Sequence, residues 1–448
     1  MDFSEKFLYH IWDAQHLTGK IRTVSGKILR IIYQGRWNTD NGPDFKNAIL
    51  KIGRKVVRGD VEIDRTTYDW HNHYHDQNYA FTAVILHVVF QNDLCYQYTH
   101  DALGKKVEIL ELRDWLDDDI RKLIKKYSNQ AFRQQDTHCP GFADIEKRDC
   151  LNYLMLMGTQ RIREKMLRFS AELYFTDFDQ LAYQGIMEAM GYSKNKYQML
   201  LLASNMSYKK LSKYKQDGMT HDEMIAILLN ASGLIDHLPD NFPTDLVVKW
   251  KRAYGLQPYN KDIIDIKWNL FRIRPANNPA VRILQVSHLL YQGLGNRLLI
   301  GFSNLFAISP LAFTTANLRT AFFKLFRDSA FIPEKYIIGS DRLDVLMINV
   351  ILPLLLAFAL KKKNAALEKA CWILYHDYPA LADNHITKYM KSKMPGQSGK
   401  KIISKSILQQ GLLHLYYKYC LHHNCEICLN DIVKFLPEGS KGNIARSE

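Results

Sequence analysis

The sequence has few cysteines, no secretory signal and no apolar run long enough to span a membrane. Seven cysteines in 448 residues are too few for a disulfide scaffold. The first residues, MDFSEKFLYHIWD, contain acids where a signal peptide has bases. The one long apolar run, Val345 to Leu360, is shorter than the roughly 20 residues of a spanning helix and contains Pro353. We therefore expect a cytoplasmic protein with no membrane partner, in which this run is a buried, Pro-kinked helix.

The composition excludes a disordered or fibrous chain. Hydrophobic residues make up 47% and charged residues 24% of the sequence, which is ordinary for a globular protein of two or three domains. The net charge of +14 is uneven, because residues 1–135 have 20 Lys and Arg against 18 Asp and Glu, and residues 136–448 have 40 against 28. This basic excess suits nucleic acid as a partner, although an ordinary basic cytosolic protein has the same balance. The oligomeric state stays unknown.

The hydrophobic pattern changes near residue 110. Before it, short β-branched runs bounded by Gly, Asn or Asp predict strands at 27–35, 47–53, 55–64 and 82–90, after an amphipathic helix at 3–16. Residues 110–127 have helical spacing, and nearly everything beyond about 145 is helical in pattern. We therefore predict an α+β protein: an α/β head over residues 1–135, with a mixed sheet of at least four strands, and a large all-α domain over residues 136–448.

Carboxylates cluster in the predicted head. Asp60, Glu62 and Asp64 alternate along one strand, so their side chains share a face and repel one another. Asp44 ends the GPDF turn one hairpin away and can reach the same face. Such oxygen ligands suit Mg²⁺ or Mn²⁺, which activate water and stabilise charge on a phosphate. A sheet with one solvated polar face produces the same pattern, so both interpretations stay open.

The order of these elements resembles the core of the PD-(D/E)XK nucleases. A helix with Glu5, a strand, a turn with Asp44, a strand with Glu62 and an apolar strand follow one another. The resemblance implies a restriction-endonuclease-like head in which Asp44 and Glu62 hold the metal. It also implies a Lys two residues after the second acid, where this chain has Asp64. The positive charge must then come from Lys46, Lys51 or a histidine.

A second resemblance extends over almost the whole chain. The segments GPDF, GDVEI, YDWHNHYHD, VILHVV, RPANNPAVRI, INVILP and YCLHHNCEIC resemble a bacterial family known as domain of unknown function 2851. That family implies no established activity, so the function has to be argued from the residues.

Histidines provide a second set of candidate ligands. His71, His73 and His75 share a face if their segment is extended, and with a carboxylate they can bind Zn²⁺ or Mn²⁺. One of them can also serve as a general base or as a donor to phosphate. The alternative is a solvated loop anchored by Trp70. His87 lies inside an apolar strand, as either a catalytic group or a core histidine.

The C-terminal cysteines have the spacing C-x4-C-x2-C at Cys420, Cys425 and Cys428. In a reducing cytosol three clustered thiols are better metal ligands than disulfide partners, so Zn²⁺ or an iron–sulfur cluster is a candidate. Such a centre needs a fourth ligand, for which the candidates are Cys371, His422 and His423. Some PD-(D/E)XK exonucleases have a cluster held by a C-terminal cysteine group. Metal-free thiols near a helix end are the alternative.

Arginines flank the RPANNP segment, among them Arg274 and Arg282. Guanidinium groups suit phosphates, but the same residues can brace loops inside an α-domain. Taken together, the residues predict a divalent-metal-dependent nuclease acting through Asp44 and Glu62, with Glu5, Asp64 and His87 beside them. The alternative is a non-catalytic scaffold that binds nucleic acid or protein through a degenerate nuclease-like head. A weaker third interpretation is a His/Asp metal hydrolase with a small substrate.

Overall fold

A computed structural model describes residues 3–39, 41–128, 139, 142, 145–192, 194–255, 264–295, 297–307, 314–327, 333–394, 402–422 and 424–436. The chain forms two compact units. The head unit comprises Met1–Tyr153, Lys393–Pro395 and Leu415–Glu448, and the helical unit comprises Leu154–Ser392 and Gly396–His414. The boundary predicted after residue 135 lies outside the described residues. That prediction assigns every later residue to one domain, whereas this grouping returns residues 415–448 to the head unit.

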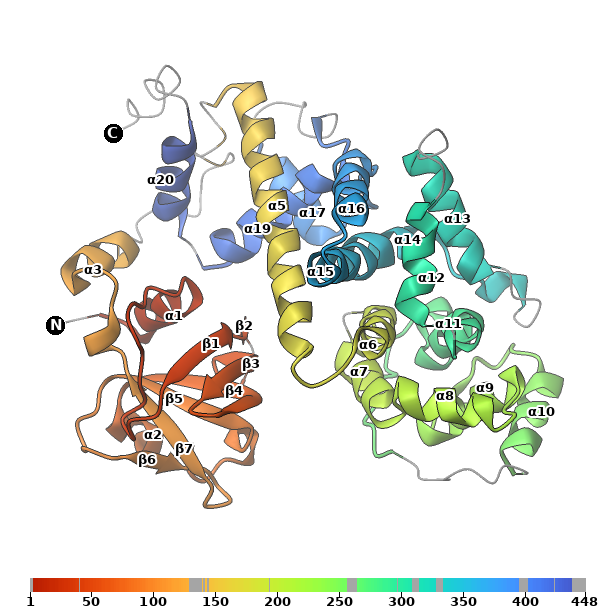
Figure 1. Ribbon diagram of the computed structural model, residues 1–448, viewed down its shortest axis with the longest axis horizontal. Helices are drawn as coiled ribbons and strands as arrows, with labels where there is room; N and C mark the ends of the chain where they lie inside the picture. The colour runs from red at the N-terminus through yellow and green to blue at the C-terminus, as the bar shows by residue number, and fades with distance from the viewer. Residues whose placement is uncertain are drawn as a thin grey trace. The chain divides into compact units, whose positions relative to one another are not determined.

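The head unit is built on a seven-stranded mixed sheet with the strand order β1-β3-β4-β5-β7-β6, in which β2 also pairs with β3 (Figure 1). The pairs β4–β5 and β5–β7 are parallel and the others are antiparallel. The mixed sheet and the α+β class are thus confirmed. The strands are β1 (Leu29–Tyr33), β2 (Arg36–Trp37), β3 (Phe45–Ile52), β4 (Lys55–Thr66), β5 (Val84–Gln91), β6 (Tyr98–His100) and β7 (Lys106–Glu111).

Helices of the head unit pack against this sheet. Helix α1 (Glu5–Asp13) contacts β4 and buries Phe7, Leu8, Ile11 and Trp12, as its amphipathic pattern predicts. Helix α2 (Thr67–Asn72) follows β4 directly, and its Trp70 is fully buried beside Phe81, Val84 and Val107. The helix predicted over 110–127 is wrong at its start, because residues 110 and 111 complete β7 and α3 begins later (Ile120–Ser128).

The C-terminal segment also belongs to the head unit. Helix α20 (Cys425–Phe435) follows a 3₁₀ turn (Cys420–His422), and the residues around this turn pack on α1 and β2. The ring of His422 stacks on Trp37 with the centroids 3.9 Å apart, and Asn424 Nδ2 donates to His10 Nε2 (3.1 Å). Both His10 and Asn424 are buried. The head unit is therefore assembled from sequence segments at both ends of the described chain.

The chain after residue 145 is overwhelmingly helical, as predicted. Buried apolar side chains form the core of the helical unit. The helices are α5 (Lys147–Glu172), α6 (Phe178–Met190), α7 (Lys196–Asn205), α8 (Tyr208–Gln216), α9 (His221–Ala231), α10 (Thr244–Gly255), α11 (Pro279–Gly293), α12 (Leu298–Asn304), α13 (Thr315–Arg327), α14 (Ser340–Leu346), α15 (Leu352–Lys362), α16 (Ala365–Asp377), α17 (His385–Ser392) and α19 (Ser406–Lys418).

Two glycines let α5 and α19 approach within the helical unit. A Cβ atom on Gly158 would lie 2.2 Å from the Ile407 carbonyl oxygen, and one on Gly411 would lie 2.1 Å from the Leu154 carbonyl oxygen. No side chain fits at either distance. The two helices therefore make close backbone contact at a crossing that only glycine permits.

The long apolar run forms a core helix with an irregular turn. A π-helical turn (Met347–Ile351) joins α14 to α15, directly before Pro353, which has no N–H to continue the regular ladder. The sequence predicts that this run is too short to span a membrane, whereas the helical segment Ser340–Lys362 is long and apolar enough to cross one. However, 78% of its most apolar window is buried inside the structure. Such burial is typical of a core helix, as the sequence predicted for this run.

Candidate functional site

Asp44 lies at the start of β3 beside an irregularity in that strand. The register of β3 against β4 shifts between Phe45 and Ala48, and Asn47 between them has a left-handed backbone (φ 57°). The Asn47 N–H donates to Asp60 Oδ1 (3.0 Å), so this backbone donor has a partner despite the irregularity. An extra residue of this kind bends a strand and redirects its side chains. Asp44 thereby comes to lie beside the acids of β4.

Asp44 and Glu62 are linked through backbone amides. The Asp44 N–H donates to Glu62 Oε2 (3.1 Å), and the Ile63 N–H donates to Asp44 Oδ2 (2.9 Å). The hydroxyl of Tyr9, one turn after Glu5 on α1, also hydrogen-bonds to Asp44. Tyr9 is not among the residues predicted for the site, although its i, i+4 spacing from Glu5 is visible in the sequence. The two acids that were predicted to bind the metal thus lie together, one directly before β3 and the other on β4.

Burial makes these carboxylates costly to ionise. Burial, and next the charge of Asp64, raises the pKa of Glu62 to about 9. Burial, and next the charge of Glu62, raises the pKa of Asp44 to about 8. The pKa of Glu5 is also raised, first by burial and then by Asp64. A bound cation would offset both causes at once.

Asp64 and Glu62 each meet histidines. His73 Nδ1 lies 3.2 Å from Asp64 Oδ1, and His87 Nε2 lies 3.1 Å from Asp64 Oδ2. His75 Nε2 lies 3.1 Å from Glu62 Oε1, yet neither ring nitrogen of His75 forms an aligned hydrogen bond with any residue that the structure describes. His75 is buried and stacks on Phe81 with the centroids 3.9 Å apart. The stacking fixes the orientation of the His75 ring, and its nitrogen atoms remain available to bind a ligand.

Three of these side chains can share one ion. Asp64, His73 and His75 each offer a ligand atom, and these atoms all lie within 4.8 Å of one another. An ion at roughly 2.0–2.2 Å from each atom needs them about 3–3.6 Å apart, a difference that small side-chain rotations cover. His87 is fully buried in β5, where its Nε2–H donates to Asp64 and orients that carboxylate. Direct binding of a metal ion by Asp44 and Glu62 stays a prediction.

The segment of the three histidines is not extended, so they do not share the face that an extended segment would give them. Asp69 Oδ2 accepts from both the N–H and the hydroxyl of Thr66, and this capping box starts α2 directly after β4. His71 therefore lies on α2, and its Nδ1 pairs with Asp76 (2.7 Å). His73 and His75 follow the helix and turn back towards the acids of β4. The signal that was missed is the capping pair at 66 and 69.

Neither Lys46 nor Lys51 takes the place of the lysine that the nuclease resemblance implies two residues after Glu62. Lys46 Nζ pairs with Asp60 Oδ2 at 2.9 Å, and the Lys51 side chain is exposed. Asp60 is the third acid of the alternating set, but the register of β4 against β5 shifts between Asp60 and Val61, and Asp60 turns to Lys46. A histidine is the remaining candidate for the positive charge, but burial lowers the pKa of His75, the one beside Glu62, and so favours its neutral form.

The C-terminal cysteines lie in the head unit around the start of α20. Burial raises the pKa of the Cys420 thiol to about 12, and the next cause is Cys139. Burial also raises the pKa of the Cys428 thiol, and the next causes are Cys139, Cys420 and Cys425. Within the described part of the chain, however, the sulfur atoms of Cys420, Cys425 and Cys428 do not lie within 4.8 Å of one another. Of the proposed fourth ligands, His422 stacks on Trp37, Cys371 belongs to the helical unit and His423 lies outside the described residues.

The two arginines of the RPANNP segment differ in exposure. Arg282 is buried, with 4% of its surface exposed, and donates to Gln285 Oε1 (2.7 Å) and Asn277 Oδ1 (2.5 Å). Its guanidinium also lies over the ring of Tyr192. These contacts brace the segment from inside, which is the alternative that the sequence left open for it. Arg274 is exposed and remains a candidate for phosphate.

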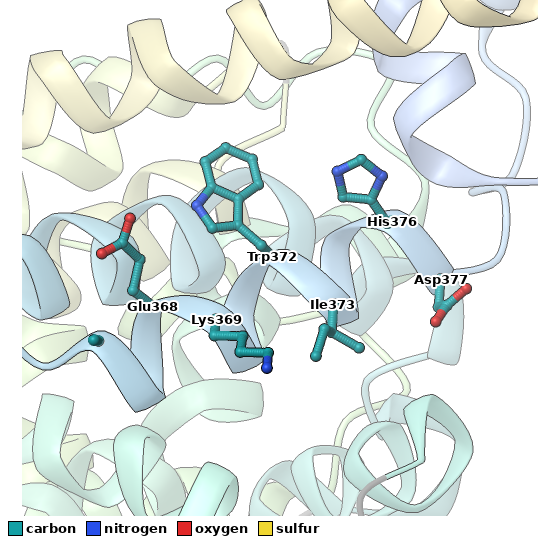
Figure 2. A pocket seen from close by; sticks show the side chains of 7 residues that line it. Glu368, Lys369, Trp372, Ile373, His376 and Asp377 are labelled. Carbon is teal, nitrogen blue, oxygen red and sulfur yellow. The ribbon is translucent and has the colours of Figure 1, made fainter.

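A hollow of about 510 Å³ on the helical unit holds none of the predicted residues. Its lining comes from α16 alone, where Glu368, Trp372 and His376 project from one side and Lys369 and Ile373 from the other (Figure 2). Side chains that diverge from one helix do not converge on a ligand. The candidate site is therefore the carboxylate and histidine cluster of the head unit.

Comparison with known proteins identifies a family but no activity. Residues 5–384 match the family described as "Protein of unknown function (DUF2851)". No curated protein and no solved structure matches the chain. Because the family match extends over most of the sequence, including every residue of the carboxylate and histidine cluster, the chain belongs to the DUF2851 family.

Proposed function

We propose that the head unit hydrolyses phosphodiester bonds of nucleic acid with a divalent ion held by Asp64, His73 and His75. The observation that carries this proposal is the approach of three ligand atoms within 4.8 Å of one another. Two imidazoles and one carboxylate favour Mn²⁺ or Zn²⁺ over the Mg²⁺ that carboxylates alone suggest. An ion there would supply a water of lowered pKa and a positive charge for a phosphate oxygen.

The neighbouring side chains support hydrolysis rather than simple metal storage. Glu62 and Asp44 lie beside the proposed ligands, and their raised pKa values reflect burial and, next, repulsion by Asp64 on Glu62 and by Glu62 on Asp44. Glu62 is placed to accept a proton from an attacking water, since a cation nearby favours its ionised form. His75 Nε2 lies 3.1 Å from Glu62 Oε1, where a ring nitrogen that does not bind the ion can orient that carboxylate.

The charge of the chain supports a polyanionic substrate. The excess of Lys and Arg falls in residues 136–448, and the head alone is nearly neutral. A neutral catalytic part joined to a basic part is an arrangement that lets electrostatic attraction concentrate nucleic acid without filling the site with cations. The restriction-endonuclease-like arrangement is part of this proposal, supported by the order Glu5, Asp44, Glu62 along α1, β3 and β4.

The test is cleavage of labelled single- and double-stranded DNA and RNA with Mn²⁺, Zn²⁺, Mg²⁺ or EDTA. Asp64→Asn and His75→Gln should abolish metal-dependent cleavage. His71→Gln is the matched control, because His71 pairs with Asp76 outside the proposed site, and it should cleave normally. If wild type cuts none of these substrates with any ion, but binds them with steep salt dependence, the non-catalytic scaffold replaces the nuclease.

A further inference from the structure

A cleft of about 670 Å³ opens in the head unit at the ends of two parallel strands. Arg65 and Thr66 end β4, Phe90 and Gln91 end β5, and all four line the cleft. In open sheets with parallel strands, ligands commonly bind just beyond the carboxyl ends of those strands. No cluster residue lines the cleft, so the cleft is a separate feature.

Two arginines that line the cleft can bind an anion. Arg65 and Arg113 both line it, and neither guanidinium forms a hydrogen bond or ion pair with any residue in the described part of the chain. The one acid in the lining, Asp118, is already engaged by Lys122 Nζ (3.1 Å) and by the Asp119 N–H (2.8 Å). The cleft therefore has a net positive charge, and guanidinium forks match phosphate oxygens in geometry.

An apolar wall stands beside the arginines. The rings of Phe3 and Phe90 meet edge to face with the centroids 4.9 Å apart, and the Arg65 guanidinium lies over the Phe3 ring at 5.4 Å. The Gln91 side chain, which is exposed, adds an amide that can donate and accept. Cationic groups next to aromatic rings suit a single-stranded nucleic acid, because the cations can bind its phosphates and the rings can stack on its bases.

Two residues that line the cleft are close in sequence to residues of the carboxylate and histidine cluster. Arg65 directly follows Asp64 on β4, and Phe3 precedes Glu5 by two residues. Glu5 is near enough to both Asp64 and Arg65 to interact electrostatically with each. Glu5 thus links the two features, and a strand whose phosphate lies at the proposed ion would have a neighbouring nucleotide within reach of Arg65.

We infer that this cleft binds the nucleotide adjacent to the phosphate that is cut, with its phosphate on Arg65 and Arg113 and its base against Phe3 and Phe90. The inference rests on the proposed function and specifies its substrate as a single strand, or a strand end, rather than an intact duplex. A duplex keeps its bases stacked in pairs, so none can reach the apolar wall.

The experiment measures binding of a fluorescein-labelled oligothymidylate to the full chain by anisotropy, in EDTA, at several salt concentrations. Arg65→Gln and Arg113→Gln should each weaken binding about tenfold and reduce the salt slope by about 0.7, the value for one lost phosphate contact on a single strand. Arg54→Gln, an exposed arginine in the turn between β3 and β4, is the matched control and should bind as wild type does.

Two results separate this inference from the proposed function. If both cleft variants bind like Arg54→Gln, the cleft assignment is overturned, even where Asp64→Asn abolishes cleavage. If the cleft variants lose affinity while no ion supports cleavage by the wild type, the cleft stands as a binding site and the nuclease proposal fails. Tighter binding of a duplex than of a single strand of the same length would also overturn the inference.

Discussion

Lowering the pH should loosen the contact between α1 and the C-terminal segment, because His10 is buried between them. His10 is 8% exposed and faces Asn424, the rings of His422 and Trp37, and the charge of Lys6 on its own helix. Burial, then His422 and Lys6, lowers the pKa of His10 from 6.5 to about 3. Below pH 6.5 the unfolded chain therefore binds a proton that the folded chain does not.

The magnitude follows from these two pKa values. The stability contributed by neutral His10 is fully present above pH 6.5 and falls by about 1.4 kcal/mol per pH unit as the pH drops towards 3. At pH 5 the loss amounts to about 2 kcal/mol, or roughly a 30-fold lower protection of the affected amides.

Hydrogen exchange of peptides from α1 and α20 at pH 7 and pH 5, corrected for intrinsic exchange rates, measures this loss locally. His10→Gln is the informative variant, since its amide can still accept from Asn424 but carries no charge at either pH. It should lose much less protection than wild type between the two pH values. His376→Gln, on the exposed side of α16, should behave as wild type does. An equal loss of protection in wild type and His10→Gln would refute the reasoning.

Three further predictions concern the metal sites and the helix crossing. Asp64→Asn, which keeps an oxygen for His87, should weaken Mn²⁺ binding by at least about 100-fold in calorimetric titrations, whereas His71→Gln should change it little. Gly411→Ala should destabilise the chain by about 1–3 kcal/mol in thermal unfolding, because its Cβ would lie 2.1 Å from a carbonyl oxygen of α5. Gly301→Ala on α12 meets no atom within 4 Å and should be neutral or stabilising by up to about 1 kcal/mol. If the C-terminal cysteines hold metal, elemental analysis of anaerobically purified protein should find stoichiometric zinc or iron that Cys428→Ser loses.

Local patterns in the sequence were enough to predict most of the head. The β-branched runs correctly predicted β1, β3, β4 and β5, and the alternation of acids placed Glu62 and Asp64 on one face. The helical spacing from residue 110 concealed the end of β7, because Leu110 and Glu111 fit a strand and a helix pattern equally well. The short helix α2 was also missed, because its signal is a capping pair and the prediction for this segment considered only the spacing of its histidines.

The remaining features depend on contacts between distant residues. Asp60 leaves the acidic set because of register shifts on both sides of β4, and a register shift has no signature in one strand's sequence. The proximity of Tyr9 to Asp44 requires the packing of α1 on the sheet. The docking of Asn424 on His10 joins residues separated by 414 positions, which no local pattern reports.

The return of the C-terminal segment to the head has a consequence for synthesis of the protein. Residues 112–424 emerge from the ribosome between β7 and α20, which at roughly 5–20 residues per second takes about 15–60 s. During that interval the sheet is complete in sequence, but Trp37 and His10 lack the side chains that cover them in the finished fold. The nascent head therefore exposes aromatic and imidazole side chains next to Tyr9 until residues 420–435 arrive.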